Sequence, residues 1–306
     1  MIKTHSEMTV TIINSQGHWQ NGWLPDNETL RHFVKNLEQS DVKVETFEVK
    51  NVSELERLLS RLDAETLLLP NAYHVNADKP GTELVWMGEI IDRFKFKTIG
   101  SSANSLRNLL QKHVCQQILR ENGVPVPDFT FINPEDMGNE KNILQKAGLT
   151  YPVIVKLTGE SCGIGISTDS VVYNEADAIR KSRQILQAYN QGVIVESFLP
   201  GHDITAARFV IGHETLHLAT HYQIGNKAVL GHEERKLPWG TNKKMIRVKE
   251  SNILNQLDEI LPKVWKALDV QDIIRLDGKL DANGQFRVFD VNGFPGLTAH
   301  CNTFPV

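Results

Sequence analysis

The chain has 306 residues, a mass of 34.5 kDa and a formal net charge of −4. Its composition of 41% hydrophobic and 23% charged residues is ordinary for a soluble globular protein, and its length predicts about two or three subdomains with substantial cores. The slightly acidic balance provides no basic surface for nucleic acid or for an anionic membrane, so we expect neither as a partner.

Cysteine usage and hydropathy predict a cytoplasmic protein. The three cysteines, Cys115, Cys162 and Cys301, are widely spaced and show no metal-ligand spacing, which is typical of a reducing compartment. No apolar run approaches the ~20 residues that a transmembrane helix needs, and the N-terminus lacks the apolar core of a secretory signal.

The N-terminal part alternates between strand-like and helix-like patterns. Helical spacing of apolar residues follows Asn27, a candidate N-cap, and a second helix begins with Ser53 and Glu56 in the arrangement of a capping box. Alternating elements of this kind predict a parallel sheet covered by helices. The expected strands are 9–14, 42–49 and 65–70, and the expected helices are 28–39 and 53–63.

The next stretch predicts helices and then a boundary. A helix over 82–94 and a short strand over 96–101 lead into a long helix over 102–122, which ends at Gly123 in a C′ position. The two prolines of VPVPDFTFI, residues 124–132, force extended backbone. We therefore expect a connector between domains there.

The residues after this connector combine strands with long loops. A buried strand runs directly into TGESCGIGIS, where three glycines fall within seven residues. The polar segment 225–247 lacks periodicity, and we interpret it as a mobile functional loop because unstructured loops of this length are otherwise uncommon. The expected strands are 151–157, 170–174, 192–200, 204–212 and 215–223, and the expected helices are 175–190 and 253–269.

The stretch from Ile273 to Asn292 predicts a β-hairpin. Asn283-Gly284 lies between two apolar-rich runs, which is the strongest short-range signal for a two-residue type I′ turn. Counting outward from that turn pairs Asp281 with Phe286, Lys279 with Val288, Asp277 with Asp290, and Arg275 with Asn292. Two carboxylates are therefore expected to face each other.

Opposed carboxylates on neighbouring strands repel each other unless a cation lies between them. With the Asn292 amide, Asp277 and Asp290 form a set of hard ligands that suits Mg²⁺ or Mn²⁺, whose remaining ligands come from water and phosphates. Arg275, one dipeptide step along the same face, is placed to hold a developing anion. The alternative is a solvated hairpin whose charges face water, and the motif alone leaves both interpretations open.

Two other strands end in charged residues that suit a nucleotide. Lys156 precedes the glycine-rich loop, where an ammonium can reach a phosphate while backbone N–H groups approach closely. The loop is neither a Walker A motif nor a GxGxxG fingerprint, so this motif alone is weak. Glu196 is placed to accept from the amino group of adenine, and the alternative is an ordinary strand end.

Together these motifs resemble those of the ATP-grasp enzymes and, within them, the D-alanyl-D-alanine ligases. The similarity is specific in VPVPDFTFI, PVIVKL…GIGIS, VIVESFLPG, RLDGKLDANGQF and FDVNGFPGLTAH, and it extends more loosely over almost the whole chain. It implies an α/β (α+β) fold, the ATP-grasp fold, with ATP between two of its three subdomains. The implied division is an N-terminal parallel α/β domain over 1–103, a central ATP-grasp subdomain over 104–200, and a C-terminal subdomain with the metal site over 201–306.

The resemblance also implies a role for each matched residue. On the nucleotide side, Lys112 and Lys156 look like the phosphate-contacting lysines, and Asp203 lies where the family has a ribose-binding acid. The central-loop residues Ser161 and Cys162 belong to the same implied site, and the implied adenine hinge consists of Glu196, Ser197, Phe198 and Leu199. The implied metal ligands are Asp277, Asp290 and Asn292.

The implied activity is the joining of a carboxylate to an amine at the expense of ATP, with Mg²⁺ or Mn²⁺ as the metal. Arg275 and the backbone N–H of Gly296 look like the groups that stabilise the tetrahedral intermediate, and Lys227 is the lysine of the mobile loop. The expected substrates are small molecules, amino acids or a dipeptide, and the resemblance suggests a homodimer. Phosphoryl transfer asks mainly for positioning and charge neutralisation, which these residues supply without a nucleophilic side chain.

The chain departs from the family's pattern where the amino acids bind. NSQGHWQNGWLPDNE replaces the usual glycine-rich first loop, and the family's serines are aligned with Cys162 and Cys301. Ala228 stands where the mobile loop usually has a tyrosine. We therefore expect a ligase whose substrates need not be two D-alanines. The alternatives are a natural-product peptide ligase or cyclo-ligase, and an ATP-binding regulatory protein without catalysis.

Overall fold

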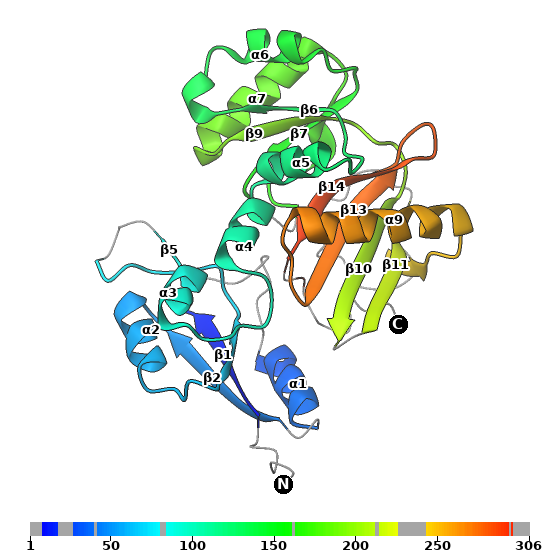
Figure 1. Ribbon diagram of the computed structural model, residues 1–306. Coiled ribbons are helices and arrows are strands. Elements are labelled where there is room, and N and C mark those ends of the chain that lie inside the picture. The colour runs from blue at the N-terminus through cyan, green and yellow to red at the C-terminus, as the bar shows by residue number, and fades with distance from the viewer. Residues whose placement is uncertain are drawn as a thin grey trace.

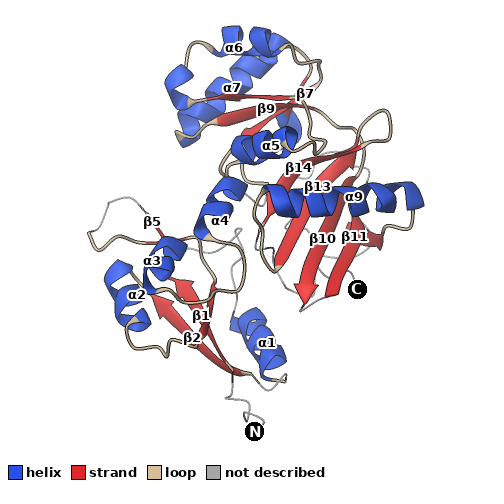
Figure 2. Ribbon diagram, viewed as in Figure 1, coloured by secondary structure: helices blue, strands red, loops and turns tan. Residues whose placement is uncertain are grey.

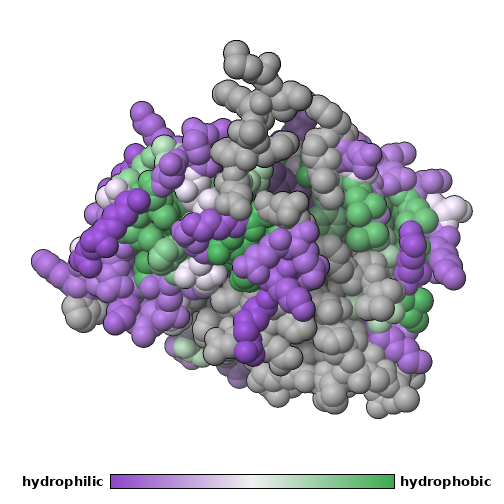
Figure 3. Space-filling model, turned by 90° about the horizontal axis from the view of Figure 1, so that it is seen from below, coloured by the Kyte–Doolittle hydropathy of each residue, from purple (hydrophilic) through white to green (hydrophobic). Residues whose placement is uncertain are grey.

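The structure, a computed structural model, describes residues 8–17, 27–39, 42–79, 84–160, 163–211, 214–225, 243–293 and 295. Within them the chain forms a three-stranded, a two-stranded, a four-stranded and a five-stranded sheet (Figure 1, Figure 2). On the side shown in Figure 3, hydrophilic residues are spread over the described surface and break up the hydrophobic areas. None of the described helices is long and apolar enough to cross a membrane.

The N-terminal sheet is parallel, as predicted, with the strand order β2-β1-β3. Its strands are β1 (Thr9–Ser15), β2 (Lys43–Val49) and β3 (Leu67–Pro70). The two faces of β1 point into different cores, because side chains alternate along a strand. Ile12 packs in the cluster that includes Val34 of helix α1 (Asn27–Glu38), and Ile13 packs with helices α2 (Val52–Leu59) and α3 (Met87–Phe94).

Two helix starts differ from the prediction. Asn27 is already the first residue of α1 and not its N-cap. Helix α2 is capped by Asn51, whose side chain accepts from the Glu54 N–H at 3.0 Å. Ser53 lies inside the helix, and its N–H and hydroxyl both donate to Asp78. An asparagine two residues earlier therefore starts the helix, since its side chain satisfies a free N–H of the first turn.

The predicted helix over 102–122 is broken at Gln111. Helix α4 (Ala103–Leu110) ends there and α5 (Lys112–Glu121) begins, because Gln111 adopts extended backbone at φ −87° and ψ 95°. The N–H of Lys112 donates to the carbonyl of Thr158 at 2.9 Å and not within the helix. A contact with a distant loop thus places Lys112 at the start of α5, and the predicted Gly123 follows that helix at φ +69°.

Other N-terminal expectations need correction as well. The predicted strand over 96–101 is reduced to one parallel bridge between Leu68 and Thr98. The predicted helix over 82–94 begins only at Met87. The strands β4 (His74–Val75) and β5 (Val85–Trp86) instead form a small antiparallel pair, which periodicity over two residues cannot indicate.

The four-stranded sheet has the order β6-β9-β7-β8 and is antiparallel throughout. The expected connector supplies its edge strand β6 (Phe129–Ile132), and the others are β7 (Val153–Leu157), β8 (Val171–Val172) and β9 (Val193–Ser197). Helices α6 (Glu140–Ala147) and α7 (Glu175–Tyr189) pack on it around Leu144, Ala178, Ile185 and Leu186. Short 3₁₀ turns lie at Pro134–Asp136 and Thr168–Ser170.

An ion pair between a buried carboxylate and a half-exposed arginine joins α6 to α7. Glu140 is fully buried and accepts two hydrogen bonds from Arg183, at 3.2 and 2.8 Å. Hydrogen bonding from Arg183 lowers the pKa of Glu140 to about 2, from an ordinary value of 4.5. A carboxylate whose pKa is lowered on folding stabilises the fold above its unfolded pKa, and this contribution is lost as the pH falls toward the folded pKa.

Arg183→Met is expected to lower the free energy of unfolding by about 1–2 kcal/mol at pH 7, toward the low end for a charge-assisted pair because Arg183 is half exposed. Urea unfolding followed by circular dichroism should show this difference shrinking between pH 4.5 and pH 2. Arg180→Met is the matched control on α7, because its ion pair with Asp177 is exposed. A difference that stays constant with pH would contradict the assignment.

The five-stranded sheet has the order β12-β11-β10-β13-β14. Its strands are β10 (Asp203–Ile211), β11 (Glu214–Ile224), β12 (Lys243–Arg247), β13 (Ile273–Leu280) and β14 (Phe286–Asn292), all antiparallel to their neighbours. Helix α9 (Ser251–Ala267) and α5 share a core with it (Figure 1). The prediction of a loop over 225–247 is wrong at its C-terminal end, because 243–247 form strand β12. Residues 226–242 lie outside the described residues.

The hairpin of β13 and β14 confirms the central prediction and corrects its ends. Asp277 pairs with Asp290 and Arg275 pairs with Asn292. Nearer the turn, Lys279 pairs with Arg287, so its predicted pairing with Val288 is wrong.

The predicted register is wrong by one residue at the turn, and a one-residue bulge further along the hairpin restores it. The turn is a three-residue loop with Gly284 at φ +76° and the Asp281 N–H donating to the Gln285 carbonyl, so Asp281 does not face Phe286. Phe289 is then an extra, bulged residue between Val288 and Asp290. Opposite this bulge, a Cβ on Gly278 would overlap the Phe286 ring, so the close approach of the strands requires glycine.

Candidate active site

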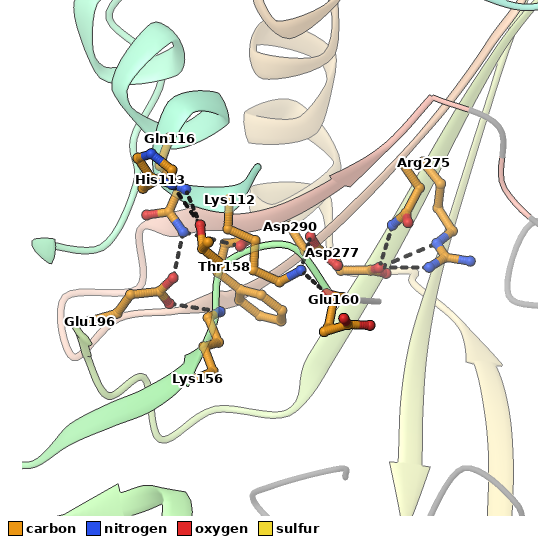
Figure 4. A network of polar contacts seen from close by, with 12 residues as sticks. Lys112, His113, Gln116, Lys156, Thr158, Glu160, Glu196, Arg275, Asp277 and Asp290 are labelled. Carbon is orange, nitrogen blue, oxygen red and sulfur yellow. Dashed lines mark hydrogen bonds and ion pairs between the residues drawn. The ribbon is translucent and has the colours of Figure 1, made fainter. Parts of the chain in front are cut away.

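The candidate site lies where the four-stranded sheet, helix α5 and the hairpin of β13 and β14 approach one another (Figure 4). Its residues come from segments far apart in the sequence, namely the first turns of α5, the end of β7 and its loop, the end of β9, and the hairpin. Most of the charged groups there are buried, including Lys112, Lys156, Glu196 and Asp277. Charges are costly to bury unless they are paired, so their partners define the site.

Asp277 is the centre of the hairpin's polar network. Its Oδ2 accepts from Arg275 Nη2 at 2.9 Å and from Asn292 Nδ2 at 3.2 Å, and its Oδ1 accepts from the Thr205 hydroxyl at 2.7 Å. Thr205 lies beside Asp277 because β10 pairs with β13. The Arg275 guanidinium is thereby fixed in orientation, with 16% of its side chain exposed.

Lys112 approaches the opposite carboxylate. Its Nζ lies 3.4 Å from Asp290 Oδ1, and it also donates to the backbone carbonyl of Glu160 in the loop after β7 (Figure 4). The hydrogen bond of its own N–H to Thr158 fixes the start of α5 against the same loop. The Lys112 ammonium therefore lies between the glycine-rich loop and the two facing carboxylates. At this place it could neutralise the negative charge of a polyphosphate.

The predicted lysine and glutamate of the nucleotide site pair with each other. Lys156 Nζ lies 2.9 Å from Glu196 Oε2, with 5% and 1% of the two side chains exposed. The antiparallel register of β7 and β9 places them diagonally on one face. Lys156 also lies 4.9 Å from the centre of the Phe289 ring, so the hairpin's bulge reaches this pair.

The structure places the other hinge and ribose candidates nearby. Ser197 ends β9, and its N–H donates to the backbone carbonyl of Asp128, while Leu199 is buried just beyond the strand. Asp203 Oδ1 lies 3.3 Å from Lys279 Nζ, which itself lies 5.6 Å from the centre of the Phe198 ring. The ribose candidate is therefore held by a lysine of β13.

The residues of the hairpin fit a hard divalent cation. Two carboxylates face each other, and Asp290 Oδ2 has no partner among the described residues. In the described part of the chain, no group of three His, Cys, Asp or Glu side chains is arranged to hold a metal ion. A metal there would need the amide of Asn292 as its third ligand, and an amide oxygen is a normal ligand for Mg²⁺.

Two titratable side chains follow Lys112 on α5, and burial shifts the pKa of each. Burial lowers the pKa of His113, which stacks on Phe131 and lies 2.6 Å from the Thr158 hydroxyl. Burial also raises the pKa of the Cys115 thiol far above its ordinary value, and the carboxylate of Asp290 adds to the shift. Cys115 is therefore a thiol and not a nucleophile.

Several predicted residues lie outside the described residues. They are Lys227 of the expected mobile loop, Gly296 after the hairpin, Ser161 and Cys162 of the glycine-rich loop, and the altered positions Ala228 and Cys301.

Sequence reasoning missed Gln116, which is buried. Its Nε2 donates to Glu196 Oε1 at 2.6 Å and to the carbonyl of Phe289 at 3.1 Å, so it joins α5, β9 and β14. The available signal was its helical spacing of four residues from Lys112, which puts both on one face of α5. Thr205 and Lys279 were missed because their partners come from strand pairing.

The family model described as D-ala D-ala ligase C-terminus matches residues 118–305, which is more than half of the chain and includes most of this site. The chain belongs to the D-alanine–D-alanine ligase family. The predicted resemblance is therefore confirmed.

Two curated relatives match this chain over only part of their own length. The uncharacterized protein y4sG of Sinorhizobium fredii is 26% identical in a 200-residue alignment that covers 62% of this chain and 54% of that protein. The D-alanine–D-alanine ligase of Thermosipho africanus is 24% identical in a 195-residue alignment that covers 62% of this chain and 52% of that enzyme. The chain thus matches about half the length of these curated relatives.

A solved structure shows the fold over nearly the whole chain. The D-alanine–D-alanine ligase of Bacillus anthracis complexed with ATP has a TM-score of 0.69 to this protein, covering 97% of this chain and 89% of that one at 16% identity. The predicted fold class, the α/β (α+β) ATP-grasp fold, is confirmed.

Proposed function

We propose that this member of the D-alanine–D-alanine ligase family is an ATP-dependent ligase that joins a carboxylate to an amine through an acyl phosphate. The observation that carries the proposal is the approach of Lys112 to Asp290, directly across the hairpin from Asp277 and its Arg275. One ammonium and one guanidinium flank two facing carboxylates, and such groups can neutralise phosphate charge and hold a metal during phosphoryl transfer from ATP.

The nucleotide would lie between the β7–β9 face and the hairpin. Glu196 and the backbone after it would hold adenine, with Lys156 beside them, and Asp203 would hold the ribose. Lys112 would neutralise the phosphates at the other end. Support comes from the order of these groups, which runs from the hinge at Glu196 to the carboxylates of the hairpin (Figure 4).

Mg²⁺ bound by Asp277, Asp290 and Asn292 would neutralise charge on the phosphates. The substrate carboxylate would attack the γ-phosphorus of ATP, which releases ADP and forms an acyl phosphate. The amine would then attack the acyl carbon, and phosphate would leave. Arg275 is oriented by Asp277 for stabilising the negative charge that develops in these steps, because a pre-oriented cation costs no reorganisation during the reaction.

The substrates are the open part of this proposal, since the amino-acid positions of the family are altered in this chain. Pairs of D- and L-amino acids and dipeptides should be screened for ADP formation with Mg²⁺ and with EDTA. We expect ADP only with Mg²⁺, a carboxylate and an amine, and a product mass equal to the two substrates less one water.

The same screen separates the alternatives. Loss of water within one substrate would identify a cyclo-ligase. ATP binding without turnover for any carboxylate would contradict the ligase proposal and favour a regulatory ATP-binding protein.

A further inference from the structure

A cleft of about 650 Å³ lies between the β4–β5 pair and the loop that follows β7. The N-terminal wall includes Tyr73, His74 and Trp86, and the opposite wall includes Glu160 and Gln191. A volume of this order holds a ligand much larger than a single small amino acid, since small-molecule sites span roughly 300–1,000 Å³.

The cleft shares a wall with the candidate site. Thr158 and Glu160 both line it, and their backbone carbonyls accept hydrogen bonds from the N–H and the ammonium of Lys112. The same ammonium lies 3.4 Å from Asp290. A ligand in the cleft would therefore contact residues that hydrogen-bond to Lys112, the group that would neutralise the phosphates.

The N-terminal wall is aromatic. The ring centres of His74 and Trp86 are 4.5 Å apart, and those of Tyr73 and Trp86 are 6.0 Å apart. Arg107 lies over the Trp86 ring at 5.0 Å from its centre and fixes the ring in place. Aromatic side chains of this kind supply a rigid surface for an apolar or planar group.

The opposite wall carries one carboxylate. Glu160 is half-buried, and its Oε1 accepts from Gln191 Nε2 at 2.8 Å. Its Oε2 has no hydrogen-bond partner within the part of the chain that the structure describes. A carboxylate oriented by an amide and left with one open oxygen is suited to a ligand ammonium.

We propose that this cleft binds the body of the carboxylate substrate, and that this substrate is a peptide with a free ammonium and a bulky apolar or aromatic N-terminal side chain. The ammonium would pair with Glu160, the side chain would pack on Trp86 and His74, and the carboxylate would point toward Lys112. This inference rests on the proposed ligase function and assigns the class of its first substrate.

Calorimetry without nucleotide tests the cleft independently of turnover. The probes are Phe-Ala as its L,L and D,D forms, with N-acetyl-Phe-Ala and free alanine as controls. We expect one Phe-Ala form to bind at least tenfold more tightly than either control. Glu160→Gln should weaken that binding about tenfold and leave N-acetyl-Phe-Ala unchanged, because only the charged ammonium loses its partner.

Two further variants complete the test. Leu84→Trp extends an exposed lining residue into the cleft and should weaken Phe-Ala binding without changing ATP binding. Glu175→Gln, on the exposed side of α7, is the matched charge control and should change nothing.

The outcomes keep the two proposals apart. Binding that depends on Glu160 without ADP formation would support the cleft and overturn the ligase function. ADP formation with other carboxylates while neither Phe-Ala form binds, or while Glu160→Gln binds as wild type, would overturn the cleft assignment and leave the ligase function standing.

Discussion

Asp290→Asn is expected to reduce Mg²⁺-dependent ATP turnover by roughly 10²- to 10³-fold, because it removes one of two facing carboxylates and keeps the side chain's shape. It should leave the free energy of unfolding within about 1 kcal/mol of wild type, since it ends both the repulsion from Asp277 and the attraction to Lys112. Loss of activity without loss of stability separates a metal ligand from a structural carboxylate.

The measurements are the rate of ADP formation and the thermal unfolding midpoint, each as a function of Mg²⁺. Wild type should be stabilised by Mg²⁺ in the presence of ATP, and the variant should not, because binding to the folded state alone raises stability. Asp258→Asn is the control, since this exposed residue of α9 has His217 as its one ion-pair partner in the described part of the chain. Full turnover in Asp290→Asn would remove the hairpin from the proposed mechanism.

Sequence patterns predicted those elements whose signal is local. The parallel N-terminal sheet follows from alternating strand and helix periods, and the strands at β7, β9, β10 and β11 follow from apolar runs. The pairing of Asp277 with Asp290 was also predicted, although the turn was wrong. The predicted pairing of Asp277 with Asp290 is nevertheless right, because the longer loop at Gly284 and the bulge at Phe289 shift the register in opposite directions.

The corrected features depend on partners far away in the chain. The break at Gln111 exists because Lys112 donates its N–H to Thr158, and nothing in the amphipathic pattern of 102–122 marks that contact. Likewise, Ser53 lies inside α2 and donates to Asp78, a contact over 25 residues that the capping-box pattern does not mark.

Within the candidate site, the residue types were predictable and the partners were not. Lys156 and Glu196 were singled out separately as a phosphate ligand and an adenine ligand. Their ion pair arises from the register of β7 against β9, which neither strand encodes alone. Gln116 was not predicted as a site residue, because a glutamine in a helical pattern indicates no role until its partner, Glu196, is known.

This buried pair predicts a large effect on stability. Lys156→Met should lower the free energy of unfolding by about 3–5 kcal/mol, because Glu196 would remain buried without its cation, with Gln116 as its one side-chain hydrogen-bond donor among the described residues. Lys181→Met is the control on α7, which packs on the same sheet, since its partner Asp169 is exposed, and it should cost less than about 1 kcal/mol.

The double variant Lys156→Met/Glu196→Gln should recover most of that loss. Neither buried charge remains, and the new amide oxygen still accepts from Gln116, so the double variant should unfold within about 1 kcal/mol of wild type. Urea unfolding of the two single variants and the double variant gives the coupling energy. A double variant as unstable as Lys156→Met would show that the two charges do not stabilise each other.

ATP binding should not recover with stability. The double variant has the fold but lacks the ammonium beside the proposed hinge and the carboxylate that would hold the adenine amino group. Calorimetry with ATP and Mg²⁺ is therefore expected to show at least tenfold weaker binding in the double variant than in wild type, since one lost charge-assisted contact is worth about 1.5–3 kcal/mol. Wild-type affinity in a stable double variant would place the nucleotide elsewhere and restrict Lys156 and Glu196 to a structural role.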